Sequence, residues 1–140
     1  MTVILTKNHY QSPKQITWND MIDKLSYEFD NENPKCLLNP YSLPTFVCHT
    51  DYYPGSFLNA FNEVKKFKEM HVYCSLGKQA PTFGRHKDDV DVLIVQAFGK
   101  MMYRIDKEYI LNPGDSLFIP ANTYHEPYVN VPRITLSFSN

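Results

Sequence analysis

The spacing of apolar residues divides the chain into a helical part and a strand-rich part. Toward the N-terminus an apolar residue recurs every three or four positions, which is the period of an amphipathic helix. The first helix is predicted to begin near Thr17, because Asp20 follows three residues later as in a capping box. Its predicted apolar face consists of Trp18, Ile22, Leu25 and Phe29. A second helix is predicted from Ser56, with an apolar face of Phe57, Phe61 and Val64.

The remaining apolar runs are short, rich in β-branched and aromatic residues, and separated by turn residues, so they predict strands. They cover residues 44–51, 70–76, 90–98, 101–105, 109–111, 116–120 and 131–140. About eight short strands joined by tight turns favour a small antiparallel barrel with the two helices packed outside it.

The last predicted strand has two different faces. Its apolar face consists of Ile134, Leu136 and Phe138. Its polar face consists of Arg133, Thr135, Ser137 and Ser139. If the apolar face packs against the rest of the domain, the polar face borders either solvent or a polar cavity inside the barrel. The alternation by itself leaves both arrangements open.

Composition and charge narrow the class of protein. A chain of 140 residues forms one domain, spanning 1–140. Its formal net charge of −1 removes the electrostatic argument for binding nucleic acid or an anionic membrane. No run approaches the roughly 20 apolar residues of a membrane span, and no signal-peptide pattern is present. Three cysteines without paired spacing indicate free thiols, so we expect a cytoplasmic protein.

The most informative chemical pattern is His86-Lys87-Asp88, followed by His125 after a run of predicted hairpins. Two imidazoles and one carboxylate form the facial triad that holds non-haem Fe(II) and leaves other coordination positions open. On a strand, residues i and i+2 point to the same side, so His86 and Asp88 can reach one metal. We therefore predict a metal site at His86, Asp88 and His125.

Other candidate sites are weaker. A second His-x-Asp pattern, His49-Thr50-Asp51, leads into a Tyr-Tyr-Pro-Gly turn instead of a long strand, so we expect it at the rim of a cavity. No nucleophile stands in a supporting turn motif. No glycine-rich loop for phosphate is present, and the chain has only five glycines.

Two segments of the chain resemble the JmjC-like cupin oxygenases. Residues 83–105 contain the His-x-Asp pattern, Asp91-Val92, an apolar strand, Gln96 and then Gly99. Residues 111–127 resemble the second cupin signature, with Pro113-Gly114-Asp115, an apolar strand, Pro120, a short loop and His125. The resemblance implies a mainly β fold, the double-stranded β-helix or jelly-roll barrel of the cupins, with the two helices flanking it.

The same resemblance implies the activity. It makes His86, Asp88 and His125 the ligands of Fe(II), and 2-oxoglutarate the co-substrate. The protein is then an oxygenase that hydroxylates its substrate and releases succinate.

The chain departs from this family at the co-substrate anchor. JmjC-like enzymes usually place a lysine on the strand after Gly99, but Met101 stands there and cannot pair with a carboxylate. Arg133 is the natural substitute, because it resembles the cation on the closing strand of prolyl-hydroxylase-like oxygenases and binds carboxylates through two parallel hydrogen bonds. A surface salt bridge is the other interpretation of Arg133. Tyr103 either binds a ligand in the cavity or packs in the core.

Met101 also supports a second hypothesis, a metal-binding cupin that does not use 2-oxoglutarate and serves as a small-molecule binder, sensor or isomerase. A degenerate cupin serving as an interaction module is less favoured, because two histidines and an aspartate are poor core material without a metal. Imidazole and carboxylate suit several divalent transition metals, so the identity of the metal is open. The substrate is a small molecule or a peptide, and a homodimer is one option for the assembly.

Overall fold

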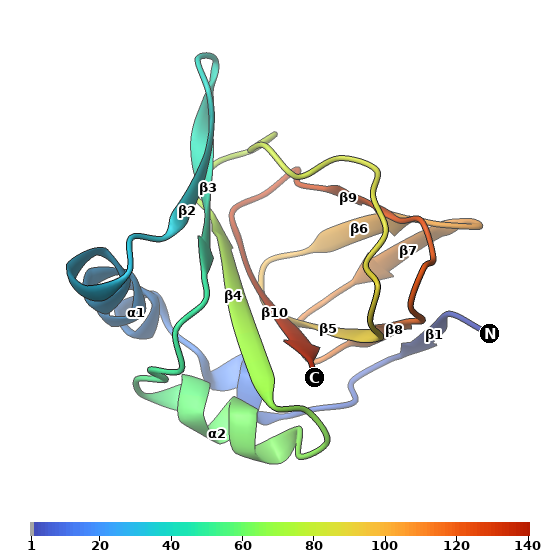
Figure 1. Ribbon diagram of the computed structural model, residues 1–140, viewed down its shortest axis with the longest axis horizontal. Helices are drawn as coiled ribbons and strands as arrows, with labels where there is room; N and C mark the ends of the chain where they lie inside the picture. Colours follow the sequence, from blue (N-terminus) through green and yellow to red (C-terminus); the bar gives the residue numbers. More distant parts are fainter. Residues whose placement is uncertain (1) are drawn as a thin grey trace.

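The computed structural model describes residues 2–140, and within them the chain forms ten strands, two α-helices and one 3-10 helix (Figure 1). The elements are β1 (Ile4–Thr6), η1 (Ser12–Gln15), α1 (Trp18–Asn31), β2 (Lys35–Asn39), β3 (Ser42–Cys48), α2 (Ser56–Glu63), β4 (Glu69–Ser75), β5 (Val92–Phe98), β6 (Met101–Arg104), β7 (Glu108–Leu111), β8 (Ser116–Ile119), β9 (Glu126–Tyr128) and β10 (Arg133–Ser139). None of the helices in this range has the length and apolar character needed to span a membrane.

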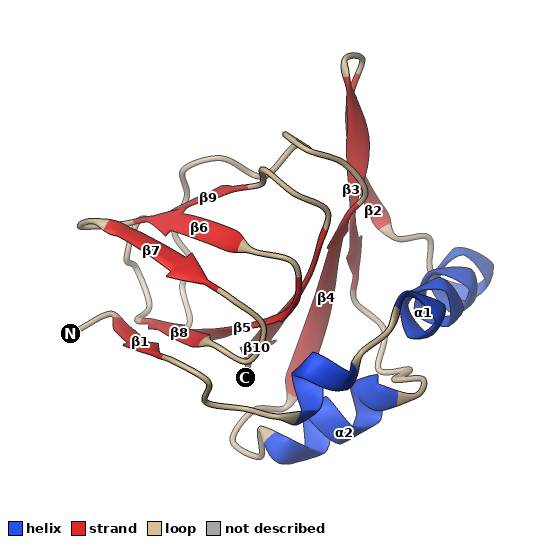
Figure 2. Cartoon of the chain, turned by 180° about the vertical axis from the view of Figure 1, so that it is seen from behind, coloured by secondary structure: helices blue, strands red, loops and turns tan. Residues whose placement is uncertain are grey.

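Two antiparallel sheets face each other. The larger sheet has the order β1-β8-β5-β10-β4-β3-β2, and the smaller has the order β7-β6-β9. Figures 1 and 2 show both helices on the outer side of the larger sheet, away from the smaller one. The predicted antiparallel barrel with outer helices is therefore confirmed. The predicted number of strands is too low, because β1, β2 and β9 are short or polar and give no clear apolar run.

The core consists of two apolar clusters. One lies between the larger sheet and the helices, where Phe57, Val72 and Leu136 are fully buried. Helix α2 contributes to this cluster as predicted, because Val64 is also buried and Phe61 packs against the cluster. The second cluster lies between the two sheets and includes Ile94, Met101, Leu111, Leu117 and Ile119. Ile94 of this second cluster also lines the cavity described below.

Helix α1 begins as predicted, but only part of its predicted apolar face packs against the core. Thr17 Oγ1 accepts a hydrogen bond from the Asp20 backbone at 3.1 Å, and Asp20 Oδ2 accepts one from the Thr17 backbone at 3.0 Å. The predicted apolar face is confirmed for Trp18 and Leu25, which pack against the core, and is wrong for Ile22, which is 58% exposed, and Phe29, which is 51% exposed. The fully buried residues are Met21, Lys24 and Glu28.

A buried ion pair explains this difference. Lys24 Nζ lies 3.5 Å from Glu28 Oε2, and both side chains are inaccessible to solvent. Lys24 Nζ also donates hydrogen bonds to the backbone oxygens of Thr50, at 2.9 Å, and Tyr52, at 2.7 Å. Glu28 accepts hydrogen bonds from the backbone N–H groups of His49 and Thr50. Because the polar atoms are satisfied by the loop 49–52, a charged helix face can be buried.

Candidate metal centre

A short antiparallel bridge brings the two halves of the predicted metal site together. The His86 backbone N–H donates to the His125 oxygen at 2.9 Å, and the His125 N–H donates to the His86 oxygen at 2.8 Å. The Asn122 backbone N–H donates to the backbone carbonyl oxygen of Asp88 at 2.7 Å. His86 and Asp88 lie outside the regular strands, so the prediction that a strand carries both is wrong. The extended backbone nevertheless directs both side chains to one side.

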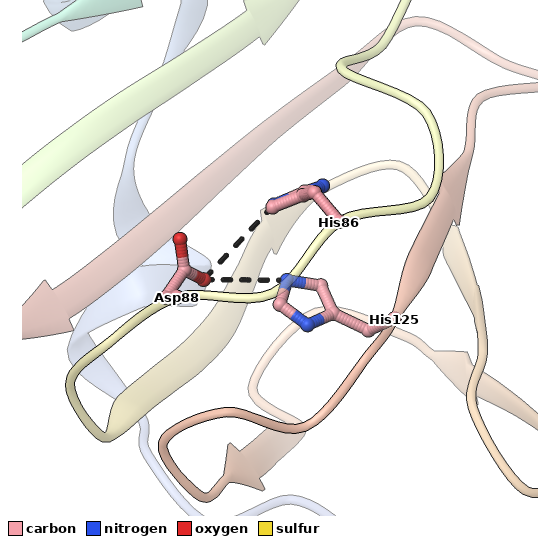
Figure 3. A group of neighbouring side chains, drawn as sticks. All are labelled: His86, Asp88 and His125. Carbon is pink, nitrogen blue, oxygen red and sulfur yellow. Dashed lines mark ion pairs between the residues drawn. The ribbon is translucent and has the colours of Figure 1, made fainter.

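The three predicted ligands converge on one point (Figure 3). Asp88 Oδ2 lies 3.4 Å from His125 Nε2 and 4.0 Å from His86 Nε2. One ligand atom from each residue lies within 4.8 Å of the other two. His125 is 5% exposed, whereas His86 and Asp88 are half-buried. The site is therefore closed on the His125 side and accessible on the other.

Backbone hydrogen bonds set the orientation of both imidazole rings. Nδ1 of His86 lies 2.8 Å from the Gly84 oxygen, and Nδ1 of His125 lies 2.9 Å from the Thr123 oxygen. A carbonyl only accepts, so in the neutral form of each ring Nδ1 carries the proton and Nε2 has a free lone pair. Metal-binding histidines make the same outer hydrogen bond. Burial lowers the pKa of His125, which favours the neutral form that binds metal. These donors fit a divalent transition metal.

The triad borders a narrow cavity of about 40 Å³ between the two sheets. Besides the triad, the walls come from strands of both sheets and from the loop before His86. They are Leu37, Thr45, Tyr73, Thr82, Phe83, Val92, Ile94, Tyr103, Pro127, Arg133 and Ser137. The cavity therefore combines a possible metal centre with apolar walls and a small number of polar groups, which is the usual composition of a ligand site.

Arg133 lies in the wall of this cavity and is 3% exposed. Its Nε donates a hydrogen bond to Ser75 Oγ at 2.8 Å, and the guanidinium lies 5.4 Å from the centre of the Tyr73 ring. Within residues 2–140, no carboxylate oxygen lies within 4.0 Å of its nitrogens, so the surface salt bridge considered for Arg133 is absent there. Burial lowers the pKa of Arg133 from its very high ordinary value. A buried cation without a protein anion is suited to binding an anionic ligand.

The cross-strand register explains why Arg133 faces inward. Arg133 pairs with Ser75, Ser75 pairs with Thr45, and Thr45 pairs with Leu37. Directly opposite residues share one face of a sheet, so this row lines the cavity. Of the two arrangements left open for the polar face of the last strand, the one facing the cavity is found. The inward roles of Tyr73 and Ser75 were missed, although their alternation with Val72 and Cys74 could have indicated them.

Tyr103 and Met101 lie on β6 of the smaller sheet, whereas Arg133 lies on β10 of the larger one. Tyr103 is buried, lines the cavity, and burial raises the pKa of its hydroxyl to about 12, so the phenol stays protonated. Met101 is fully buried in the apolar cluster between the sheets. The position at which the family usually carries a cation is thus part of the core in this chain.

The second His-x-Asp pattern is not part of the triad, and the expectation that it lies at the rim of the cavity is wrong, because neither His49 nor Asp51 lines the triad's cavity. The His49 ring packs edge-on against His71, with 4.5 Å between the ring centres. Its backbone N–H donates to Glu28, the buried carboxylate of α1. The pattern therefore belongs to the attachment of α1 to the sheet.

Similarity to known proteins was found in sequence and in structure. No family model matches the chain. A probable ribosomal oxygenase of Haemophilus influenzae is 23% identical over an alignment of 109 residues, and the match covers 60% of this chain and 27% of that protein. YcfD, a ribosomal oxygenase from Escherichia coli in complex with cobalt and 2-oxoglutarate, superposes with a TM-score of 0.71 and 16% identity, covering 99% of this chain and 47% of YcfD. A cupin superfamily protein from Desulfitobacterium hafniense gives a TM-score of 0.53 and 12% identity, covering 73% and 82%.

These comparisons establish the architecture. The chain spans about half the length of YcfD and about a quarter of the Haemophilus influenzae protein. Nearly the whole chain superposes on YcfD, and a separate cupin shares the same barrel. The fold is therefore the double-stranded β-helix of the cupins, and the chain resembles the JmjC-like cupin oxygenases in both fold and sequence.

Proposed function

We propose that this protein is an Fe(II)- and 2-oxoglutarate-dependent oxygenase. The observation that carries the proposal is that the buried Arg133 guanidinium and the triad of His86, Asp88 and His125 line the same cavity. A 2-oxoglutarate molecule has two ends with different requirements. Its 2-oxo acid end suits a metal with open coordination positions, and its distal carboxylate suits a buried guanidinium.

In this proposal His86, Asp88 and His125 hold the metal. Bound there, Fe(II) supplies the activation of O₂ that couples oxidation of 2-oxoglutarate to succinate and CO₂ with hydroxylation of a substrate C–H bond. The complex of YcfD with cobalt and 2-oxoglutarate supports this pairing of metal and co-substrate by analogy.

The other cavity residues bind and orient the co-substrate. Arg133 binds the distal carboxylate through two hydrogen bonds, and Ser75 holds the guanidinium in place through Nε. The Tyr103 hydroxyl, which stays protonated, can donate to the same carboxylate. Val92 and Ile94 form an apolar wall that limits access of water to the site.

We further propose that the substrate is a segment of polypeptide inside the cell. The support is the name ribosomal oxygenase, which both the Haemophilus influenzae relative and the Escherichia coli structure carry. A ribosome consists of protein and RNA, and the net charge of −1 gives no electrostatic argument for binding RNA, so a protein segment is the substrate that we propose.

A metal-binding cupin without 2-oxoglutarate is the second candidate. Met101 favours it, because the strand that usually supplies the anchoring cation carries an apolar residue that is fully buried. The two candidate functions differ in whether the distal carboxylate of 2-oxoglutarate binds Arg133.

Anaerobic titration of the Fe(II)-loaded protein with 2-oxoglutarate separates the two candidates. Chelation of Fe(II) by the 2-oxo acid gives a visible metal-to-ligand charge-transfer band, and the proposal expects this band. In His86→Ala, metal binding and the band should both be lost. A protein that binds Fe(II) through His86 but gives no band with 2-oxoglutarate would contradict the oxygenase proposal and favour the second candidate.

A further inference from the structure

The backbone of residues 85–87, a bend followed by the single bridge at His86, has one open edge beside the metal ligands. His86 exchanges both of its backbone hydrogen bonds with His125. In an extended chain, the N–H and C=O groups of successive residues point to opposite sides, so those of Arg85 and Lys87 point away from His125. Among residues 2–140, these groups of Arg85 and Lys87 have no hydrogen-bond partner.

This edge has space next to it. A side chain added at Gly84, the residue before this edge, would meet no atom within 4 Å apart from those of its two chain neighbours. The side chains of Arg85 and Lys87 do not cover the edge, because both reach over the Tyr124 ring, at 4.3 Å and 5.2 Å from its centre. An extended chain can therefore approach the edge from solvent.

The edge also borders the mouth of the cavity. Phe83, two residues before Arg85, lines the cavity and is 40% exposed. Across the mouth lies β2, the last strand of the larger sheet, which contributes Leu37 to the same cavity. Lys35 of β2 reaches over the Phe83 ring, with Nζ 4.7 Å from its centre. The mouth therefore lies between two strand edges.

We propose that an extended segment of a polypeptide substrate pairs with residues 85–87 as an added strand. The N–H and C=O groups of Arg85 and Lys87 form no backbone hydrogen bond within residues 2–140, and an exposed edge of this kind is a template for a further strand. A small molecule or a nucleic acid does not present alternating amide groups at this spacing. This inference rests on the proposed oxygenase function and adds the docking mode.

The proposed pairing delivers one substrate side chain to the metal. Residues directly opposite each other in an antiparallel pair have side chains on the same face, with Cβ atoms about 4.5–5.5 Å apart. The His86 side chain points into the cavity, so a substrate residue opposite His86 directs its side chain into the cavity as well. Its neighbours in the segment point away from the cavity. The strand register thus selects the residue that is hydroxylated.

The test uses a library of 12-residue peptides of random sequence, displayed on their encoding mRNA. The wild-type protein, loaded with Co(II) and 2-oxoglutarate so that no turnover occurs, is immobilised and used to capture peptides. The captured peptides are synthesised with one N-methyl group at each position in turn. Binding should weaken tenfold or more at alternate positions, because only every second N–H pairs with the edge. Exchange of the Arg85 and Lys87 amide protons should slow at least tenfold in the complex.

A matched pair of variants locates the contact on the protein. Lys87→Pro removes the backbone N–H and should lose peptide capture, whereas Lys87→Ala removes only the side chain and should retain it. Retention of capture by Lys87→Pro would overturn the proposal. Failure to capture any peptide, an N-methyl effect without alternation, or unchanged exchange at Arg85 and Lys87 would each do the same. If Lys87→Pro fails to fold, the exchange and N-methyl measurements on the wild-type protein decide.

The proposed function fails by a different measurement. If Fe(II)-loaded wild-type protein gives no charge-transfer band with 2-oxoglutarate, the oxygenase proposal is wrong even where peptides pair with residues 85–87. If the band is present and peptides do not pair with this edge, only the docking mode is wrong.

Discussion

Replacing Arg133 with glutamine should weaken binding of 2-oxoglutarate by about 10²-fold. The guanidinium is 3% exposed and without a carboxylate partner in residues 2–140, so its two outer nitrogens are free for a ligand. A hydrogen bond to a charged group contributes roughly 1.5–3 kcal/mol, and a bidentate pair contributes two of them. Glutamine keeps one neutral donor worth about 1 kcal/mol. The net loss is about 3 kcal/mol, and each 1.4 kcal/mol corresponds to about tenfold in Kd.

The assay is anaerobic titration of Fe(II)-loaded protein, followed through the charge-transfer band. Arg133→Lys retains one charged contact without the bidentate geometry and should lose about tenfold. Ser75→Ala removes the Nε hydrogen bond that orients the guanidinium and the hydroxyl hydrogen bond between Ser75 and Thr45, but it keeps the charge. Its effect on 2-oxoglutarate binding should therefore be smaller than that of Arg133→Gln. Thermal unfolding and Fe(II) binding establish that each variant is folded. An Arg133→Gln protein that binds 2-oxoglutarate within threefold of wild type would refute the anchor assignment.

Three further predictions concern stability and reactivity. Glu28→Ala leaves Lys24 as an unpaired buried charge and should lower the free energy of unfolding by about 3–5 kcal/mol in urea titrations; a loss below about 1 kcal/mol would contradict this. Burial raises the pKa of Glu28, but hydrogen bonds from Thr50 and His49 outweigh it and hold that pKa below its ordinary value of about 4.3. The stabilisation by Glu28 is therefore present above that value and lost as the pH falls through the lower folded-state pKa, so Glu28→Gln should flatten the dependence of unfolding free energy on pH in this acidic range. Exposed Cys36 should be the one thiol that reacts with a chromogenic disulfide at pH 8 in the native protein. Cys48 and Cys74 are buried, and burial raises the pKa of each thiol to about 12. Fast reaction of all three thiols before denaturation would contradict this and show that the core opens readily.

The local pattern of apolar and turn residues was sufficient to predict most strands of the barrel. The strands from 92 to 119 follow β-branched runs and turn residues, and each of these signals lies within a few positions of the element that it predicts. Helix α2 was predicted for the same reason, since Phe57 and Val64 are buried by their own apolar character. Strand β2 was missed because it is an edge strand with exposed residues, and its pairing with β3 comes from the hairpin between them.

Helix α1 illustrates a failure of apolar periodicity. Lys24 and Glu28 are the most polar residues of its buried face, so a count of apolar residues assigns that face to solvent. They are buried because the loop 49–52, distant in sequence, supplies acceptors for Lys24 and donors for Glu28. No local signal in α1 encodes the position of that loop.

The sequence by itself determined the chemical types at the site, two imidazoles and a carboxylate around a strand-and-turn framework, because residue identity and short-range spacing are local properties. Only the tertiary structure decided which face of β10 is inside, and therefore that Arg133 is a buried cation in the wall of the triad's cavity. It also decided that the backbone of residues 85–87 is paired on one side and open on the other. Both depend on which strands lie next to each other, and strand pairing is set by burial and register over the whole chain.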